Sequence, residues 1–157
     1  MLVITSKSPY AVRALSELAR RGDSAPVPIG DLARARDIPV QFLEGLFATL
    51  RRAGVLQSQR GVKGGYSFAR PPSEVTLLEI VDLLEGELGV EAAASGPIWT
   101  EAADAVRAVL ASTTIADVAE REARDSSIAS RSERRKTGHN ERVRCSRAAV
   151  QVGFQRF

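Results

Sequence analysis

The chain of 157 residues is 44% hydrophobic, which is enough to build the core of one domain with an appendage, but short for two full domains. No apolar run approaches the ~20 residues that a membrane span needs, and the start MLVITSKSP turns polar too soon for a signal peptide, so we expect a cytoplasmic protein without membrane contact. The formal net charge is only +3, and the single cysteine, Cys145, excludes an internal disulfide and a paired-thiolate metal site.

The first 39 residues predict two helices and a break. The pair Ser8-Pro9 can open a first helix, with the serine hydroxyl as its cap, and Gly22 can close it. A short second helix is predicted over the stretch IGDLARAR at residues 29–36. The sequence Asp-Ile-Pro at residues 37–39 then breaks the chain sharply, as expected between two packed helices.

A third helix is predicted over residues 39–53, because its apolar residues recur at helical spacing. That stripe consists of Phe42, Leu43, Leu46, Phe47 and Leu50. The opposite face holds small or polar residues, namely Gln41, Glu44, Gly45, Ala48 and Arg52. A glycine inside a helix costs ~1 kcal/mol relative to alanine, so Gly45 indicates either tolerated drift or a place where something large comes close.

A β-hairpin is predicted over residues 55–70, where VLQSQR and YSFAR flank a turn rich in glycine. Gly61, Gly64 and Gly65 would let this turn bring its backbone close to a polyanion. The cations Arg60 and Lys63 would then meet phosphates. A nucleotide-binding P-loop is excluded, because it requires a lysine followed by Ser/Thr and a helix, whereas here glycines and a strand follow.

Two further helices are predicted beyond the hairpin. The stretch TLLE at residues 76–79 is a capping box at the head of a fourth helix that ends at Gly86. A fifth helix is expected over residues 97–111, and a short helix, TIADVAERE, follows it. The apolar stripe of the fifth helix includes Trp99, Ala102, Val106, Val109 and Leu110. Periodicity alone fits this stripe to an ordinary core helix as well as to an interface.

This order of elements predicts the fold class. Helix, short helix, sharp turn, third helix and hairpin is the order of a winged helix-turn-helix domain, which is mainly α with a small β-hairpin wing. In such domains the third helix enters the DNA major groove, and the wing lies along the backbone or reaches the minor groove. The side-chain-poor face around Gly45 and Ala48 could seat deeply between the DNA strands.

Charge is segregated along the chain in a way that agrees with a partly DNA-facing protein. Residues 1–70 hold 11 Lys/Arg against 5 Asp/Glu, whereas residues 71–129 hold 3 against 12. Residues 130–157 are basic again, with 8 against 2. The asymmetry predicts that the first half faces a polyanion, although the same charges could simply solvate helix faces.

Four stretches carry a resemblance to a known family, namely SKSPYAVRAL, IPVQFLEGLFATLRRAGVL, RGVKGGYSFARPP and TLLEIVDLLEG. In order and spacing the chain resembles the Rrf2 (BadM/IscR/NsrR/CymR-like) family of bacterial winged-helix transcription regulators over roughly residues 1–122. The resemblance implies a homodimer that packs through the long fifth helix around Trp99, binds double-stranded operator DNA of near two-fold symmetry, and usually represses transcription.

The same resemblance implies roles for individual residues. Base reading falls on Gln41 and Glu44, with Arg51 and Arg52 near the DNA backbone. The wing falls on Arg60, Gly61, Gly64 and Gly65. Glutamine can pair with adenine, and glutamate can accept from the cytosine amine. The alternative for Gln41 and Glu44 is a solvated helix face.

The sequence departs from the family in its presumed sensor loop. Many members hold an iron–sulfur cluster through three cysteines between the fourth and fifth helices, but GELGVEAAASGPIW here contains neither cysteine nor histidine. Because thiolates hold such clusters, we expect no metal and no cofactor. A small effector, a partner protein, or no sensor at all are the alternatives for signal input.

The expected organisation is a winged helix-turn-helix domain over residues 1–86, an effector-loop remnant with dimerisation helices over 87–125, and a basic tail over 126–157. The tail is either a disordered arm that adds non-specific DNA affinity or an accidental extension. The alternative function is a protein-interaction module on the same scaffold with an acidic surface. An enzyme is disfavoured, because no catalytic constellation is present and the only histidine, His139, lies in the tail.

Overall fold

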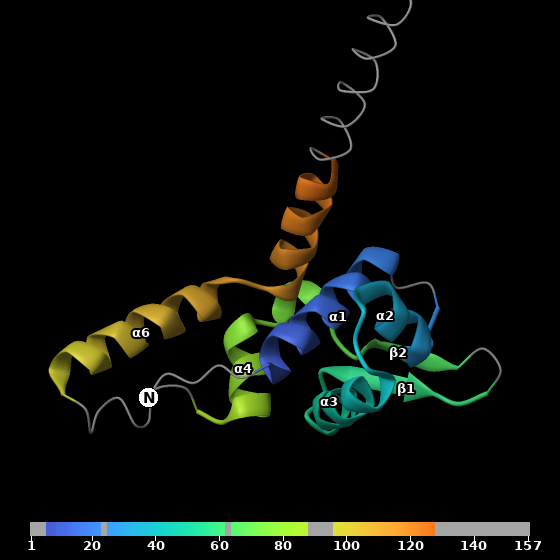
Figure 1. Ribbon diagram of the computed structural model, residues 1–157, viewed down its shortest axis with the longest axis horizontal. Coiled ribbons are helices and arrows are strands. Elements are labelled where there is room, and N and C mark those ends of the chain that lie inside the picture. The colour runs from blue at the N-terminus through green and yellow to red at the C-terminus, as the bar shows by residue number, and fades with distance from the viewer. Residues whose placement is uncertain (1–5, 23–24, 62–63, 88–95, 128–157) are drawn as a thin grey trace, which may run out of the picture. The chain divides into compact units, whose positions relative to one another are not determined.

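The computed structural model describes residues 6–22, 25–61, 64–87 and 96–127 (Figure 1). The chain forms two compact units, residues 1–119 and 120–157. The first unit contains every labelled element, and in the second unit residues 120–127 are helical. None of the helices in the described ranges is both long and apolar enough to span a membrane.

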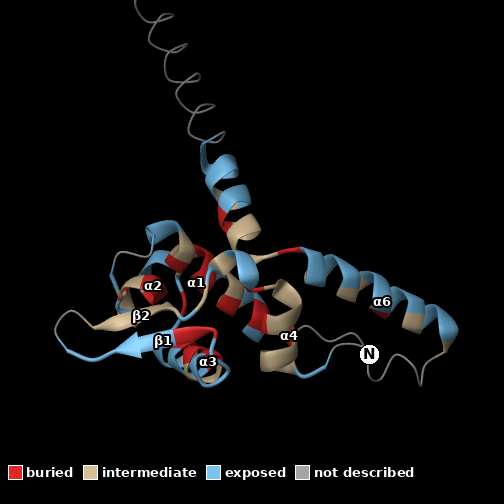
Figure 2. Cartoon of the chain, turned by 180° about the vertical axis from the view of Figure 1, so that it is seen from behind, coloured by how far each residue is buried: buried red, intermediate tan, exposed pale blue. Residues whose placement is uncertain are grey.

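Three helices build the core of the first unit, as the spacing of their apolar residues predicts. They are α1 (Lys7–Arg21), α2 (Ile29–Arg36) and α3 (Val40–Arg52), and α1 packs on both of the others. Figure 2 shows the buried residues where these helices face one another. The fully buried side chains include Leu15, Leu32, Leu43, Phe47 and Leu50.

The start of α1 differs from the prediction, because Ser8 does not cap the helix. The helix begins at Lys7 with Ser6 at the capping position. The amide and the hydroxyl of Ser8 both donate to Oε1 of Glu85, at 3.1 and 3.0 Å. A carboxylate from another helix therefore satisfies the first turn of α1, a contact across 77 residues that local sequence cannot reveal.

The hairpin is present where it was predicted. Strand β1 (Leu56–Gln59) pairs antiparallel with β2 (Gly65–Phe68), placing Leu56 opposite Phe68 and Gln59 opposite Gly65. The connector before α2 adds one more pairing that was not predicted. Val27 exchanges two backbone hydrogen bonds with Tyr66, at 2.9 and 2.8 Å. The wing is thus attached to the helical core along its β2 edge.

Beyond the wing lie a 3-10 turn, η1 (Pro72–Glu74), and the helices α4 (Leu77–Glu85) and α6 (Pro97–Ser112). Thr76 caps α4, because its Oγ1 accepts from the amide of Glu79 at 3.2 Å. The residues that follow α6 pair with the head of α4: Leu77 donates to the Thr113 carbonyl, and Ile115 donates to that of Val75. A helix then starts at Ile115. The mainly helical fold with a hairpin wing is confirmed, while the domain limits at residues 86 and 125 stay predictions.

Candidate DNA interface

The outer face of α3, defined as Gln41, Glu44, Gly45, Ala48 and Arg52, is open to solvent. All of these residues are exposed except Ala48, which is half-buried. A Cβ placed on Gly45 would meet nothing within 4 Å. No internal packing in the described chain therefore requires glycine here, and the missing side chain leaves the face flat at its middle.

The place where α3 begins is set by a tight turn after α2. Asp37 closes α2 in the left-handed conformation, with φ 53° and ψ 54°, and it is the one non-glycine residue with positive φ in the described chain. The amide of Ile38 then donates back to the Ala33 carbonyl at 2.9 Å. Asp adopts this conformation more readily than most residues. The turn that it forms sets the direction in which α3 starts.

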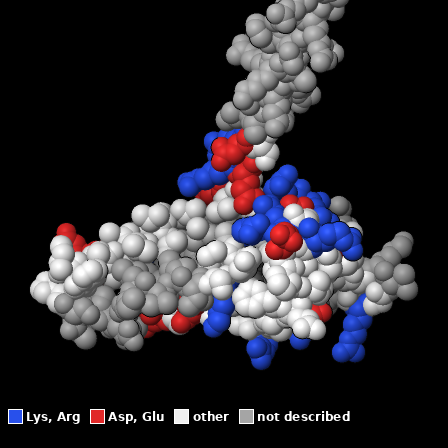
Figure 3. Space-filling view, viewed as in Figure 1, with Lys and Arg blue, Asp and Glu red and all other residues white. Residues whose placement is uncertain are grey.

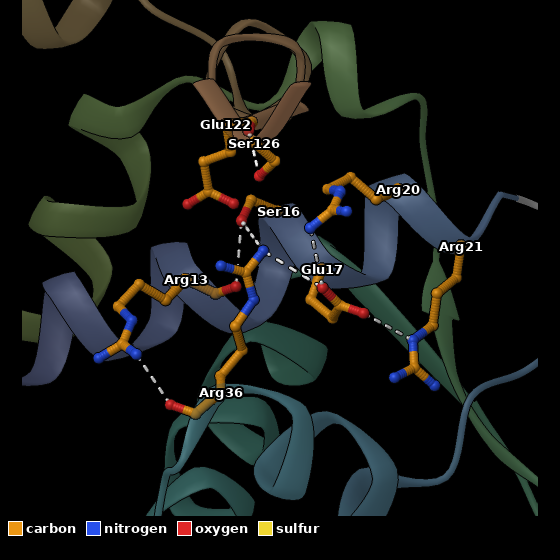
Figure 4. Close-up of polar contacts among 8 residues, drawn as sticks. All are labelled: Arg13, Ser16, Glu17, Arg20, Arg21, Arg36, Glu122 and Ser126. Atoms are coloured by element: carbon orange, nitrogen blue, oxygen red, sulfur yellow. Dashed lines mark hydrogen bonds and ion pairs between the residues drawn. The ribbon is translucent and has the colours of Figure 1, made fainter. Parts of the chain in front are cut away.

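A polar network between α1 and α2 supports that turn (Figure 4). Arg13 Nη2 donates to the carbonyl of Arg36 at 2.8 Å. The guanidinium of Arg36 in turn contacts Ser16 Oγ at 3.1 Å and Glu17 Oε2 at 3.3 Å. These contacts join the end of α2 to α1 directly before the turn, so they help to orient α3.

The two arginines at the end of α3 make different contacts. Arg51 Nη1 donates to Ser58 Oγ on β1 at 3.1 Å, which joins the helix to the wing. Arg52 Nη2 donates to Thr49 Oγ1 within the same helix at 3.3 Å. Both arginines are exposed, so their remaining donors face solvent. The sequence did not predict a role for Ser58, because no local pattern indicates that Arg51 and Ser58, seven residues apart on a helix and a strand, share a hydrogen bond.

The glycines of the wing have internal structural roles. Gly61 adopts φ 111°, which side chains rarely allow. A Cβ on Gly64 would lie 2.4 Å from the Gln59 carbonyl oxygen, and a Cβ on Gly65 would lie 2.3 Å from that of Val27. The close approach that requires glycine at positions 64 and 65 is thus to the protein's own backbone. Their contact with DNA stays a prediction.

Two cations were predicted at the wing, Arg60 and Lys63, and the described residues include one of them. Arg60 is exposed directly after β1, whereas Lys63 lies outside the described residues. Figure 3 shows Lys and Arg side chains projecting below α3 and the hairpin, and a second group over α1 and α2. The face that carries α3 and the wing therefore presents cations toward any polyanion that approaches it.

Helix α6 carries two adjoining apolar stripes instead of the single one predicted. Ala103 is 3% exposed, and Val106 and Leu110 on the same side are half-buried, as expected of a stripe that packs on α4. The second stripe, called here the free face of α6, is exposed and consists of Ile98, Ala102, Ala105 and Val109. Ile98 is 68% exposed and Val109 64% exposed. Trp99, 56% exposed, lies beside the free face.

The predicted dimerisation set therefore spans both stripes of α6. Ala102 and Val109 belong to the free face, whereas Val106 and Leu110 lie on the side toward α4. Ile98, one turn before Ala102 on the free face, was not part of the predicted set.

The sequence matches the model of one protein family. The model of the Rrf2 family, described as iron-dependent transcriptional regulator, matches residues 4–121. The chain belongs to the Rrf2 family. It is therefore a DNA-binding transcriptional regulator, and the face formed by α3 and the wing is its candidate DNA interface.

Individual members of the Rrf2 family agree with this assignment. The chain is 35% identical over 129 residues to an HTH-type transcriptional regulator of Mycobacterium tuberculosis, covering 74% of this chain and 80% of that protein. It is 33% identical over 122 residues to CymR of Bacillus subtilis, covering 74% and 88%. The solved structure of B. subtilis CymR, titled the global cysteine regulator, superposes with a TM-score of 0.68 at 34% identity, covering 76% of this chain and 98% of CymR.

The family description implies iron, and the donor atoms of this Rrf2 protein do not fit an iron–sulfur cluster at the family's position. The segment between α4 and α6, residues 86–96, supplies neither thiolate nor imidazole. Across the part of the chain that the structure describes, no three His, Cys, Asp or Glu residues gather to hold a metal ion. Since such clusters need cysteine thiolates or histidine as ligands, no chemistry is assigned to one here.

Proposed function

We propose that this Rrf2 protein is a homodimeric repressor that is not an enzyme and reads a near-palindromic operator with α3 and the wing. The observation that carries the proposal is the outer face of α3, which is polar at its start and bare at Gly45. An exposed α-helix with a flat, side-chain-poor middle suits the major groove, because the backbone can approach the base edges closely.

Sequence would be read by the first turns of α3. Gln41 can make a bidentate pair with adenine, and Glu44 can accept from the amino group of cytosine. Arg52 lies toward the end of the same face, where a guanidinium is suited to phosphate oxygens. This division puts base contacts at the start of the helix and backbone contacts at its end.

The wing would fix the register of the protein on the duplex. Arg60 leaves β1 directly before the turn, and Lys63 follows in the same turn of the sequence. Cations at such a position neutralise phosphates or enter a narrow minor groove. They add affinity without selecting one base sequence.

Two copies would associate through the free face of α6. Exposed isoleucine, valine and tryptophan side chains on one helix are costly in water, and a second copy that buries them gains about 25 cal/mol per Å² of apolar surface. A two-fold pair would place its α3 helices about one DNA turn, ~34 Å, apart, as a palindromic operator requires.

Signal input in this protein would not pass through a thiolate-held cluster. A small effector or a partner protein would act instead, and the acidic region over residues 71–129 offers a surface for either.

The proposal is tested by selecting DNA with the full chain. The purified protein is incubated with sheared genomic DNA of its source at near-physiological salt, and bound fragments are sequenced. Enrichment of one near-palindromic site upstream of genes, together with reduced transcription from that site in a reconstituted assay, is expected. Recovery of unenriched DNA, or of none, would contradict the proposal and favour a protein-interaction module.

A further inference from the structure

Arg70 follows the wing, and its half-buried side chain contacts the next two elements, η1 and α4. The last hydrogen bond of the hairpin region runs from the Ala69 amide to the Val55 carbonyl at 3.0 Å. Directly after it, Arg70 Nη1 donates to the carbonyl of Glu74 at 3.3 Å, and Nη2 forms an ion pair with the carboxylate of Glu79. The hydrogen bond with Glu79 is the main cause that raises the pKa of Arg70 above its ordinary value.

Glu79 is drawn away from its expected local role by this contact. In a complete capping box the glutamate carboxylate returns to the amide of the capping residue. Here Thr76 Oγ1 accepts from the Glu79 amide as expected, but the Glu79 carboxylate accepts from Arg70 instead. The side chain thus links α4 to the exit of the wing.

The N-terminal end of α4 is itself held in place by backbone hydrogen bonds, so it can support the wing. It pairs with the chain leaving α6 through two backbone hydrogen bonds of 2.9 Å, from Leu77 to Thr113 and from Ile115 to Val75. Farther along α4, Asp82 forms an ion pair with Arg107 of α6 at 3.7 Å. The contact between Arg70 and Glu79 therefore links the wing to α4, and α4 is in turn linked to α6, the helix that carries the free face.

The wing needs such support, because a two-stranded hairpin is only marginally stable by itself. Its β2 edge is held by the Val27–Tyr66 pairing, and β1 is joined to α3 by the Arg51–Ser58 contact. Of the residues of β1, only Leu56 is buried, whereas Gln57, Ser58 and Gln59 are all exposed. The contacts of Arg70 with Glu74 and Glu79 add a further attachment of the wing, at the end of β2.

We propose that Arg70 is a positioning residue, which acts through Glu79 to hold the wing where Arg60 meets the DNA backbone. Arg70 itself does not contact DNA in this scheme. The inference rests on the proposed function, because it requires that the wing binds DNA.

The test compares dissociation constants of full-length variants on a short labelled duplex carrying the most enriched site, and on a random-sequence duplex. Glu79→Gln keeps every cation, yet it removes the partner of Arg70. Positioning predicts that Glu79→Gln and Arg70→Gln each weaken binding to both duplexes about five- to tenfold, within the range of coupled contacts. If Arg70 instead touched a phosphate, Glu79→Gln would leave binding unchanged or strengthen it, and the inference would be overturned.

A double-mutant cycle with Arg60→Gln separates positioning from general destabilisation. If Arg70 acts only by placing the wing cation, the double variant Arg60→Gln with Arg70→Gln binds within about twofold of Arg60→Gln alone. Losses that multiply would overturn the inference. The reversed pair, Arg70→Glu with Glu79→Arg, is expected to recover most of the affinity lost by either single change, which a direct phosphate contact does not allow.

Two controls complete the design. Arg34→Gln breaks an exposed pair with Asp31, whose side chains are 83% and 46% exposed, and it should bind like the parent. Thermal unfolding of each variant shows whether it is folded. If Arg70→Gln does not fold, Arg70→Lys replaces it in the comparison. A parent that binds neither duplex would overturn the proposed function itself, whereas a parent that binds with Glu79→Gln equal to it overturns only the role of Arg70.

Discussion

Gly65 lies so close to Val27 that a Cβ at position 65 would stand 2.3 Å from the Val27 carbonyl oxygen. The two residues belong to the wing and to the connector before α2, and the neighbouring Tyr66 pairs with Val27 through both of its backbone groups. Backbone contacts therefore fix the base of the wing to the helical core. Gly65 is needed at this position to allow the close packing, whether or not the wing binds DNA.

Gly65→Ala is accordingly expected to destabilise the fold. A methyl group cannot be accommodated without separating two backbone segments, which should lower the free energy of unfolding by about 1–3 kcal/mol, as overpacking usually does. Urea unfolding followed by circular dichroism measures the change. An unaltered midpoint and slope would mean that Val27 and Gly65 are not in contact in solution.

Gly45→Ala should have the opposite effect on stability. Nothing lies within 4 Å of the added Cβ, and alanine is the better helix former, so the free energy of unfolding should rise by about 0.5–1 kcal/mol. Affinity for the selected operator should nevertheless fall, because the methyl group stands on the face proposed to seat in the groove. Gly30→Ala, a matched helical glycine on α2 with equally open surroundings, should leave DNA binding unchanged.

Arg60→Gln should weaken DNA binding without changing its sequence preference. One phosphate contact fewer predicts that the slope of log affinity against log salt becomes shallower by about one unit. Anisotropy titrations at a series of salt concentrations give this slope. A preserved slope would place Arg60 away from the DNA backbone.

Glu44→Ala and Gln41→Ala should change which site is preferred. Loss of one specific base contact removes about 1–3 kcal/mol of discrimination at the position it reads. Repeating the genomic selection with each variant should relax the enriched motif at one position in each half-site. A motif identical to that of the parent would mean that these residues form a solvated helix face.

Val109→Glu should separate the proposed dimer. The substitution puts a carboxylate on the last residue of the free face of α6, where a second copy would bury it without a partner. Light scattering should then report the mass of one chain, and operator affinity should fall with it. Asp104→Asn on the same helix is the control and should keep the parent's mass, whereas Val106→Glu, on the side toward α4, should destabilise the protomer itself.

Patterns along single helices were predictable from the sequence, since helical spacing depends on neighbouring residues. The buried stripe of Leu43, Leu46, Phe47 and Leu50 and the cap of α4 at Thr76 are confirmed on that basis. The order of elements was equally informative, because it is the order of a winged helix-turn-helix domain.

Contacts between distant segments were not predictable. The serine assigned as the cap of α1 instead donates to Glu85, and the glutamate of the expected capping box turns to Arg70. Which stripe of α6 is left exposed depends on where α4 packs, and periodicity carries no information about that choice. Long-range packing, not local propensity, thus decided every outcome that differed.

The position of Trp99 has one more consequence. It is the single tryptophan of the chain, and its side chain lies 56% exposed beside the free face of α6. All indole fluorescence of the protein therefore originates next to the surface where two copies are proposed to meet. Its emission wavelength and its quenching by iodide, followed on dilution, make self-association visible without any label.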